Sequence, residues 1–469
     1  MLEAGFEPDF SDAVLRQVTT AVAVSPTISR VDMRDLLWSS IDNPTSRDLD
    51  QIEFVERKSN GELTIRLGIA DVDAFVPKGS PADLRAAQNG FSIYLGVVTF
   101  PMLPPQLSYD LTSLLPDKIR EAVVFDITLD ADDRIGPAAV ALAEVRNRAQ
   151  LNYESIGAWL EQSTNVPPIL ANTPGLVDQL KLQQEVAQRL HAQRFRAGAL
   201  EFESIEPQPV MSGGDITGLA LQRKNRARDL IEDLMIAANR AIAAFLQAHG
   251  CPSIQRVIPT PERWPRIVEL ASQHGGRLPD EADAVELEKF LSSQRRKDPA
   301  RFPDLSLAIV KLIGPAEYVV VRDKNDATGH FSLAVDDYTH STAPNRRYPD
   351  LIVQRLLKAA VTNQPCPYSI EELEEIATRC NDRAKAARNI ERLMRKVVAA
   401  TFLRNRIGQT FTGIVTGATE RGTFVRISDP PAEGKIVRGE AGLDVGDSVR
   451  VKLIATTPKK GFIDFARSG

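Results

Sequence analysis

Cysteine and long apolar runs are both scarce in this chain of 469 residues. The three cysteines, Cys251, Cys366 and Cys380, are odd in number and far apart, so they form neither a zinc-ligand pattern nor a disulfide framework. No stretch approaches the apolar length of a membrane-spanning helix, and the acidic start around Glu3 is unlike a signal peptide. We therefore expect a cytoplasmic protein without a membrane partner.

An excess of basic charge is also missing. The chain has 57 Lys and Arg residues against 62 Asp and Glu residues, and its formal net charge is −5. This balance argues against a protein that coats nucleic acid non-specifically, although a local basic surface remains compatible with it. The length allows two or three domains with a large buried core, as expected for a soluble globular protein.

The apolar pattern predicts an α+β fold rather than a repeating βαβ unit. Residues 1–30 form an N-terminal extension with a helical pattern, and residues 31–405 read as one large domain. Within that domain, residues 63–70 have a strand pattern. Residues 226–249 carry the strongest helical stripe, which ends at a glycine and a proline.

The composition changes at Arg406. Residues 406–469 lack a helical period and contain five short strand patterns separated by glycines, which is the size of an oligonucleotide-binding barrel. Lys and Arg outnumber Asp and Glu in this segment, against the trend of the whole chain. Phe411 and Phe424 lie on predicted strands. An outward-facing ring would stack on a base, whereas an inward-facing ring would join the barrel core, and the pattern leaves both alternatives open.

Three carboxylates lie close together in the segment 40–51. Asp42 follows an apolar run, and Asp48 and Asp50 are two residues apart, so they point to the same side of an extended segment. Oxygen ligands of this kind suit Mg²⁺ or Mn²⁺ rather than zinc. Phosphodiester hydrolysis uses such an ion to activate a water molecule and to neutralise the leaving oxygen. The alternative is a set of solvated turns and helix caps.

Several further segments follow in a fixed order: 69–72, 101–114, 152–154, 231–239, 330–340 and 342–351. Together with the Asp-rich segment they resemble the motifs of the RNase II/RNase R (RNB) family of 3′→5′ exoribonucleases. Residues 407–469 are similar to the S1 domain at the C-terminus of that family. The resemblance covers about 30–469. It implies an RNB catalytic domain followed by a small five-stranded OB-fold (S1) barrel.

The resemblance also implies a metal site built from Asp42, Asp48, Asp50 and Gln51. Asp50 is the residue that we expect to be indispensable for catalysis. Gln51 stands where the family has a fourth aspartate. Its amide oxygen is able to bind a cation, but the site loses one negative charge, so we expect weaker metal binding and reduced activity.

The arginine motif of the family corresponds to Arg346 and Arg347. A guanidinium at Arg346 would clamp the scissile phosphate and stabilise its transition state, which makes Arg346 the second predicted catalytic residue. Both arginines are also predicted to bind RNA. The alternative for Arg346 is a surface salt bridge, which is common for an arginine before a helix.

Three residues of the catalytic domain are further candidates for RNA binding. Tyr153 would stack on the terminal base, and Phe195 would cover the other side of that base. Glu232 would accept a hydrogen bond from the terminal ribose, and recognition of the 2′-hydroxyl would select RNA over DNA. The alternatives are a half-buried core position for Tyr153 and a solvated helix face for Glu232. We expect His330 and His340 to be structural.

These features predict a metal-dependent hydrolytic 3′→5′ exoribonuclease that degrades single-stranded RNA to 5′-mononucleotides, with Mg²⁺ or Mn²⁺ as cofactor. The alternative, motivated by Gln51, is an RNA-binding regulator that kept the fold and lost the chemistry. A DNA-directed nuclease is disfavoured only by the resemblance. No obligate protein partner is expected.

Overall fold

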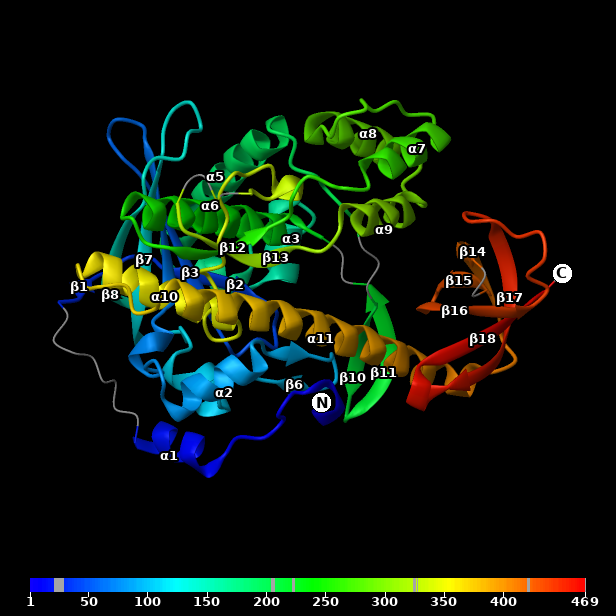
Figure 1. Cartoon of the computed structure of the whole chain (residues 1–469), viewed down its shortest axis with the longest axis horizontal. Helices are drawn as coiled ribbons and strands as arrows, with labels where there is room; N and C mark the ends of the chain where they lie inside the picture. The colour runs from blue at the N-terminus through cyan, green and yellow to red at the C-terminus, as the bar shows by residue number, and fades with distance from the viewer. Residues whose placement is uncertain are drawn as a thin grey trace.

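A seven-stranded mixed sheet lies at the centre of the larger domain in the computed structural model (Figure 1). Its strand order is β1 (Val31–Asp32), β8 (Ala139–Arg146), β7 (Ile119–Leu129), β4 (Leu63–Ala70), β3 (Gln51–Arg57), β2 (Ser39–Asp42) and β9 (Ala149–Asn152). The strands from β8 to β2 are antiparallel neighbours, whereas β1 joins β8 and β9 joins β2 in parallel. The strand predicted at 63–70 has the same bounds in the structure.

The structure describes residues 1–20, 29–203, 207–221, 224–323, 326, 328–419 and 422–468. In the N-terminal extension, α1 (Asp12–Thr20) packs beside α2 (Pro81–Asn89) and buries Val14 and Val18. The rest of the predicted helical extension, residues 21–28, lies outside the described residues. None of the helices in the described part of the chain is both long and apolar enough to cross a membrane.

Helices with one apolar side pack on the sheet. The predicted helix at 226–249 is α6 (Arg226–Ala248), and it begins where the side chain of Asn225 accepts a hydrogen bond from the backbone N–H of Arg228 at 3.0 Å. Helix α5 (Leu176–Arg196) packs against α6 and β3. The other helices are α3 (Tyr153–Leu160), α4 (Pro168–Asn172), α7 (Trp264–Gln273), α8 (Ala284–Lys297), α9 (Phe302–Ile313), α10 (Tyr348–Val361) and α11 (Ile370–Leu403).

Helix α11 leads from the larger domain to the C-terminal barrel and runs along most of the molecule (Figure 1). Ser369 and Glu372 close a capping box at its start, which satisfies backbone N–H groups that the helix itself leaves open. Its last turns carry Ala399, Ala400 and Leu403, which pack into the core of the barrel. The barrel therefore shares its core with the helix that precedes it.

Five strands close into the barrel predicted from the sequence. Their order is β14 (Thr410–Thr419), β15 (Gly422–Ser428), β16 (Pro431–Arg438), β18 (Phe462–Arg467) and β17 (Ser448–Thr457). Arg426 of β15 binds Asp304 of α9, with 3.1 Å between Nη2 and Oδ2, so a charged contact also joins the barrel to the catalytic domain. The α+β class and the five-stranded barrel are confirmed; the boundary at Arg406 stays a prediction.

Three short antiparallel pairs complete the described fold. They are β5 (Ile93–Tyr94) with β6 (Thr99–Phe100), β10 (Pro207–Ser212) with β11 (Asp215–Leu221), and β12 (Ser253–Val257) with β13 (Glu317–Val321). The β10–β11 hairpin lies between the larger domain and the barrel (Figure 1), and Leu219 on it packs against the barrel core. The β5–β6 pair is important for the site because Tyr94 belongs to it.

Candidate active site

The Asp-rich segment lies where β2 ends and β3 begins. Asp42 is the last residue of β2, and Asp50 directly precedes β3. Because these strands are neighbours in the sheet, the connecting loop returns to the end from which it left. Ser113 fixes that loop, since its hydroxyl accepts from the backbone N–H of Leu49 at 3.0 Å and donates to the carbonyl of Arg47 at 2.7 Å. The fold thus gathers the predicted carboxylates at one end of the central sheet.

Asp50 is buried and contacts the predicted arginine motif. Its Oδ1 accepts a hydrogen bond from the backbone N–H of Asn345 at 2.9 Å, and its Oδ2 accepts one from Nε of Arg346 at 3.1 Å. Burial raises the pKa of Asp50 to about 7, and the nearby charge of Asp48 adds to this rise, although Arg346 opposes it. The two predicted catalytic residues, almost 300 positions apart in the sequence, are therefore in contact.

Asp42 and Asp48 complete the acidic group. Asp42 is buried, and its Oδ2 has no hydrogen-bond partner among the described residues. Burial raises the pKa of Asp42 to about 6; a hydrogen bond with Ser40 opposes the rise and the charge of Asp48 adds to it. Asp48 accepts a hydrogen bond from the hydroxyl of Tyr94. Sequence reasoning missed Tyr94, because no local pattern shows that β5 folds back over the Asp-rich loop.

The donor chemistry of this group fits a hard divalent cation, which prefers carboxylate and amide oxygens. The unpaired Oδ2 of Asp42 is an oxygen that a cation would satisfy, and Gln51 is buried at the start of β3 beside Asp50. Across the described ranges, no three His, Cys, Asp or Glu side chains already have the spacing of a metal site. Asp50 is instead held by Arg346.

The segment before α10 is held in place by buried hydrogen bonds. Asn239 of α6 accepts from both the backbone N–H and the hydroxyl of Ser341, at 2.8 and 2.9 Å. Asp350 accepts from the backbone N–H of Ala343 at 2.8 Å and from Nη2 of Arg347 at 2.7 Å. Arg347 therefore pairs with Asp350 in the first turn of α10, the helix that it precedes. Arg346 points to Asp50 instead, and 41% of its side chain is exposed.

Tyr153 lies beside the acidic group because β9 pairs with β2. The parallel ladder sets Asp42 opposite Asn152, and Tyr153 follows as the first residue of α3. The guanidinium of Arg228 lies 4.2 Å from the centre of the Tyr153 ring and also donates to the side chain of Asn43 at 3.1 Å. The ring is half-buried, with one side covered by a cation that sequence reasoning did not identify.

The contacts of Phe195 and Glu232 are with residues outside the acidic group. Phe195 of α5 stacks on His191, with 4.3 Å between the ring centres. The exposed side chain of Glu232 on α6 pairs with Nζ of Lys224 at 3.1 Å. The contacts described for these two residues do not include Tyr153 or the acidic group. Their predicted contacts with the terminal nucleotide stay predictions.

The two barrel phenylalanines differ in their environment. Phe411 meets Phe465 of the barrel core edge-on, with 6.4 Å between ring centres. Phe424 alternates with the buried residues Val425 and Ile427, so it lies on the outer side of β15 and is half-exposed. Phe424 thus has the better position for contact with a base, and RNA binding by either ring stays a prediction.

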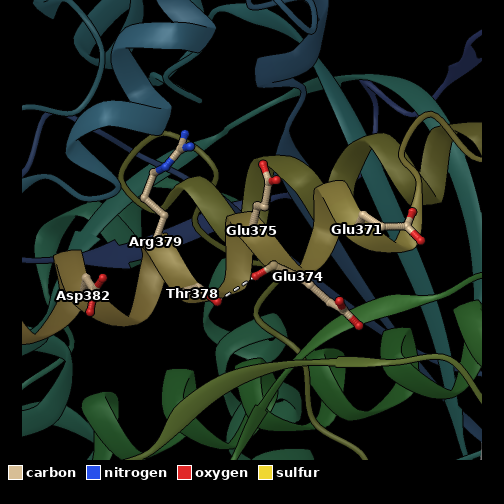
Figure 2. A pocket seen from close by; sticks show the side chains of 6 residues that line it. All are labelled: Glu371, Glu374, Glu375, Thr378, Arg379 and Asp382. Carbon is tan, nitrogen blue, oxygen red and sulfur yellow. Dashed lines mark hydrogen bonds between the residues drawn. The ribbon is translucent and has the colours of Figure 1, made fainter.

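A wide hollow of about 580 Å³ lies away from the Asp-rich segment, along α11 (Figure 2). Four of the six side chains that line it are acidic, and the only lining cation is Arg379. Phosphate groups would be repelled by this surface, so it does not suit the backbone of RNA. Its lining residues are Glu371, Glu374, Glu375, Thr378, Arg379 and Asp382.

Comparison with known proteins confirms the resemblance. The RNB domain matches residues 30–363, and the RNase II-type exonuclease C-terminal S1 domain matches residues 409–468. Ribonuclease R 1 of Lactococcus lactis subsp. lactis (strain IL1403) is 26% identical over 494 residues, which cover 97% of this chain and 59% of that relative. The chain thus spans about three fifths of the length of this relative.

Two solved structures show the same fold. Mycoplasma genitalium RNase R in complex with ribose methylated single-stranded RNA matches with a TM-score of 0.89 and 24% identity, over 100% of this chain and 77% of that chain. Yeast Ssd1, a pseudonuclease, matches with a TM-score of 0.69 and 20% identity, over 87% of this chain and 50% of that chain. Because the RNB domain matches well over half of the sequence and the S1 domain matches its barrel, the chain belongs to the RNB family.

Proposed function

We propose that this protein is a divalent-metal-dependent 3′→5′ exoribonuclease that hydrolyses single-stranded RNA to 5′-mononucleotides. The contact between Asp50 and Arg346 is the observation that carries the proposal, because it brings the acidic group and a guanidinium together. An acidic group alone repels a phosphodiester, whereas a guanidinium beside it offers the phosphate a charged hydrogen-bond partner. Membership in the RNB family, with Ribonuclease R among the relatives, supports the same reaction.

In this reaction a water oxygen bonds to phosphorus, the bond from phosphorus to the 3′-oxygen breaks, and a proton ends on that departing oxygen. Asp42, Asp48 and Gln51 would hold the cation, with Asp50 joining them; the cation supplies an activated water and neutralises charge on the phosphate. Asp50 holds Arg346 through Nε, so the two terminal amino groups of the guanidinium serve for a phosphate. Arg346 thereby stabilises negative charge that grows in the transition state.

The position of Tyr153 supports two parts of the proposal. One is the removal of one nucleotide in each cleavage step, and the other is the preference for single-stranded RNA. Since Tyr153 follows the residue paired with Asp42, a base stacked on its ring lies next to the acidic group, and the first phosphate inward from the 3′ end reaches the carboxylates. Stacking needs an unpaired base, which favours single strands. Glu232 would accept from the terminal ribose, and the barrel would hold RNA further from the end. A cytoplasmic location and the choice between Mg²⁺ and Mn²⁺ stay predictions.

A binding protein without nuclease activity is the second candidate. The missing carboxylate at Gln51 favours this second candidate, and yeast Ssd1, a pseudonuclease, has a similar fold. Against it stands the burial of Asp42 and Asp50, since buried carboxylates reduce stability and a protein that only binds RNA has no use for them. Their retention beside Arg346 supports an enzyme.

RNA with a free or a blocked 3′ end distinguishes the two candidates. With Mg²⁺ or Mn²⁺ we expect 5′-mononucleotides from the free end alone, and no product in EDTA. Asp50→Asn should lower kcat at least a hundredfold while RNA binding persists. Asp132→Asn, in an exposed turn, is the matched control and should keep full activity. RNA binding without any metal-dependent cleavage by the unaltered protein would establish the binding protein instead.

A further inference from the structure

Glu53 is a buried carboxylate for which the mechanism has no use so far. It lies on the central strand β3, its side chain is fully buried, and neither carboxylate oxygen has a hydrogen-bond partner among the described residues. Burial of a carboxylate without a partner costs several kcal/mol, so an unsatisfied one requires an explanation. An ion or a water molecule bound at this place would provide it.

The strand places Glu53 on the same side as Gln51, because residues two apart on a strand share a face. The charge of Asp42 adds to burial in raising the pKa of Glu53. Burial raises the pKa of the Tyr153 hydroxyl, and the charges of Asp42 and Glu53 add to that rise. Glu53 is therefore within electrostatic reach of the acidic group and of the predicted base platform.

Two residues that pair with the backbone of Glu53 also have buried oxygens without a partner among the described residues. Ser39 is its partner across the β2–β3 ladder, and the Ser39 hydroxyl is fully buried without a partner. Gln183 of α5 donates through Nε2 to the backbone carbonyl of Glu53 at 3.4 Å, yet its own Oε1 is buried and unpaired. With Oδ2 of Asp42, these unpaired atoms are all oxygens. Unsatisfied oxygens of this kind are the environment that a hard cation or its water ligands satisfy.

We propose that Glu53 supplies the carboxylate that Gln51 lacks, so that the bound divalent cation again faces four carboxylates, those of Asp42, Asp48, Asp50 and Glu53. The inference rests on the proposed function. It deepens that function by assigning the metal site a residue two positions further along the same strand. Glu53 acts either as a direct ligand or through a cation-bound water.

Binding of Mn²⁺ to the RNA-free protein tests the proposal without reference to activity. Electron paramagnetic resonance counts the unbound Mn²⁺ in titrations of the full chain. We expect Glu53→Gln, which keeps the size of the side chain, to weaken Mn²⁺ binding about tenfold or more. Glu56→Gln is the matched control, because Glu56 is on the opposite side of β3, exposed and paired with Arg66 at 2.8 Å. Its Mn²⁺ affinity should equal that of the unaltered protein.

A double variant with Gln51→Asp and Glu53→Gln restores the number of carboxylates on the same face of β3, and it should recover most of the lost Mn²⁺ affinity. This variant also keeps the test decisive if Glu53→Gln alone fails to fold. Equal Mn²⁺ affinity of the folded Glu53→Gln variant, or no recovery in the double variant, would overturn the role of Glu53 and leave the proposed function intact. Absence of Mn²⁺ binding in the unaltered protein would instead refute the metal dependence of the proposed function.

Discussion

The ring of Tyr153 is half-buried and is contacted by Arg228, 4.2 Å from its centre, so a base would stack on the exposed part of the ring. Stacking on an aromatic ring contributes about 1–3 kcal/mol per base, so Tyr153→Ala should weaken binding of a short RNA by that amount or lengthen the final product. Tyr153→Phe should keep both properties. Fluorescence anisotropy and sizing of the end product measure these effects. A large fall in Tm with unchanged RNA binding would show that the ring belongs to the core.

His330 is buried and His340 is half-buried, and their low pKa values predict a loss of stability in acid. Burial lowers the pKa of His330 to about 4 and lowers that of His340 well below its usual value. The unfolded chain takes up these protons near pH 6.5 and the folded chain does not. The free energy of unfolding therefore falls as the pH drops from about 6.5 toward 4, by about 1.4 kcal/mol per unit of pKa difference.

Urea unfolding at pH 7.5 and pH 5.0 measures this loss. His330→Gln should reduce the difference between the two pH values, because the variant removes one of the protonations that favour the unfolded chain. His274→Gln, at an exposed position, is the control and should leave the difference unchanged. An identical difference in all three proteins would mean that other groups cause the acid sensitivity.

The sequence indicated the acidic residues of the candidate site, but not the residues that contact them. Asp48 and Asp50 were identifiable because their spacing on one short segment is itself the signal. Tyr94 and Arg228 had no such signal, since each reaches the site from an element paired elsewhere in the fold. Glu53 was hidden for another reason. A charged residue that alternates with apolar neighbours on a strand looks like the exposed side of that strand until its burial is known.

At the scale of elements, the start of α10 fixes the position of Arg346. Asp350 is fully buried and holds both Ala343 and Arg347, so Asp350→Ala would leave a largely buried guanidinium without its carboxylate partner. Loss of one member of a buried ion pair costs about 3–5 kcal/mol. We expect urea unfolding to show that loss and kcat to fall as Arg346 shifts. Asp350→Asn keeps an acceptor and should lose less; equal kcat in all three proteins would contradict this role of the helix start.

Helices and strands with a strong local apolar pattern were predictable from the sequence, whereas the pairing between strands was not. The strand 63–70 and helix α6 were both readable from apolar spacing and end signals. The parallel pairing of β9 with β2 was not readable from the sequence, because spacing within one strand says nothing about which strand lies beside it. That pairing decides where Tyr153 lies.

At the scale of the whole molecule, the ion pair between Arg426 and Asp304 joins the barrel to the catalytic domain. Both side chains are largely buried, so Arg426→Asp should loosen the barrel and raise KM for a long RNA about tenfold, while KM for a trinucleotide stays unchanged. The charge swap that combines Arg426→Asp with Asp304→Arg should restore the contact. Steady-state kinetics with both substrates measures the effect. Equal increases in KM for both RNAs would exclude a role of barrel position in holding long strands.

Removal of the barrel is a poorer test of the same role. Ala399, Ala400 and Leu403 of α11 pack into the barrel core, so a chain ending near Arg406 would expose their apolar surface. An exposed apolar patch promotes aggregation, which would raise KM for reasons unrelated to RNA. The substitutions at the ion pair keep that core intact.

The parallel ladder between β2 and β9 also affects how the protein can change over evolution. The register that sets Asp42 opposite Asn152 fixes the separation between Tyr153 and the carboxylates. The chain between them includes exposed turns, such as the one at Asp132, where inserted residues are tolerated. Such insertions would reshape the surface without altering that separation. Relatives can therefore acquire new surface loops in this region without changing the distance between Tyr153 and the carboxylates.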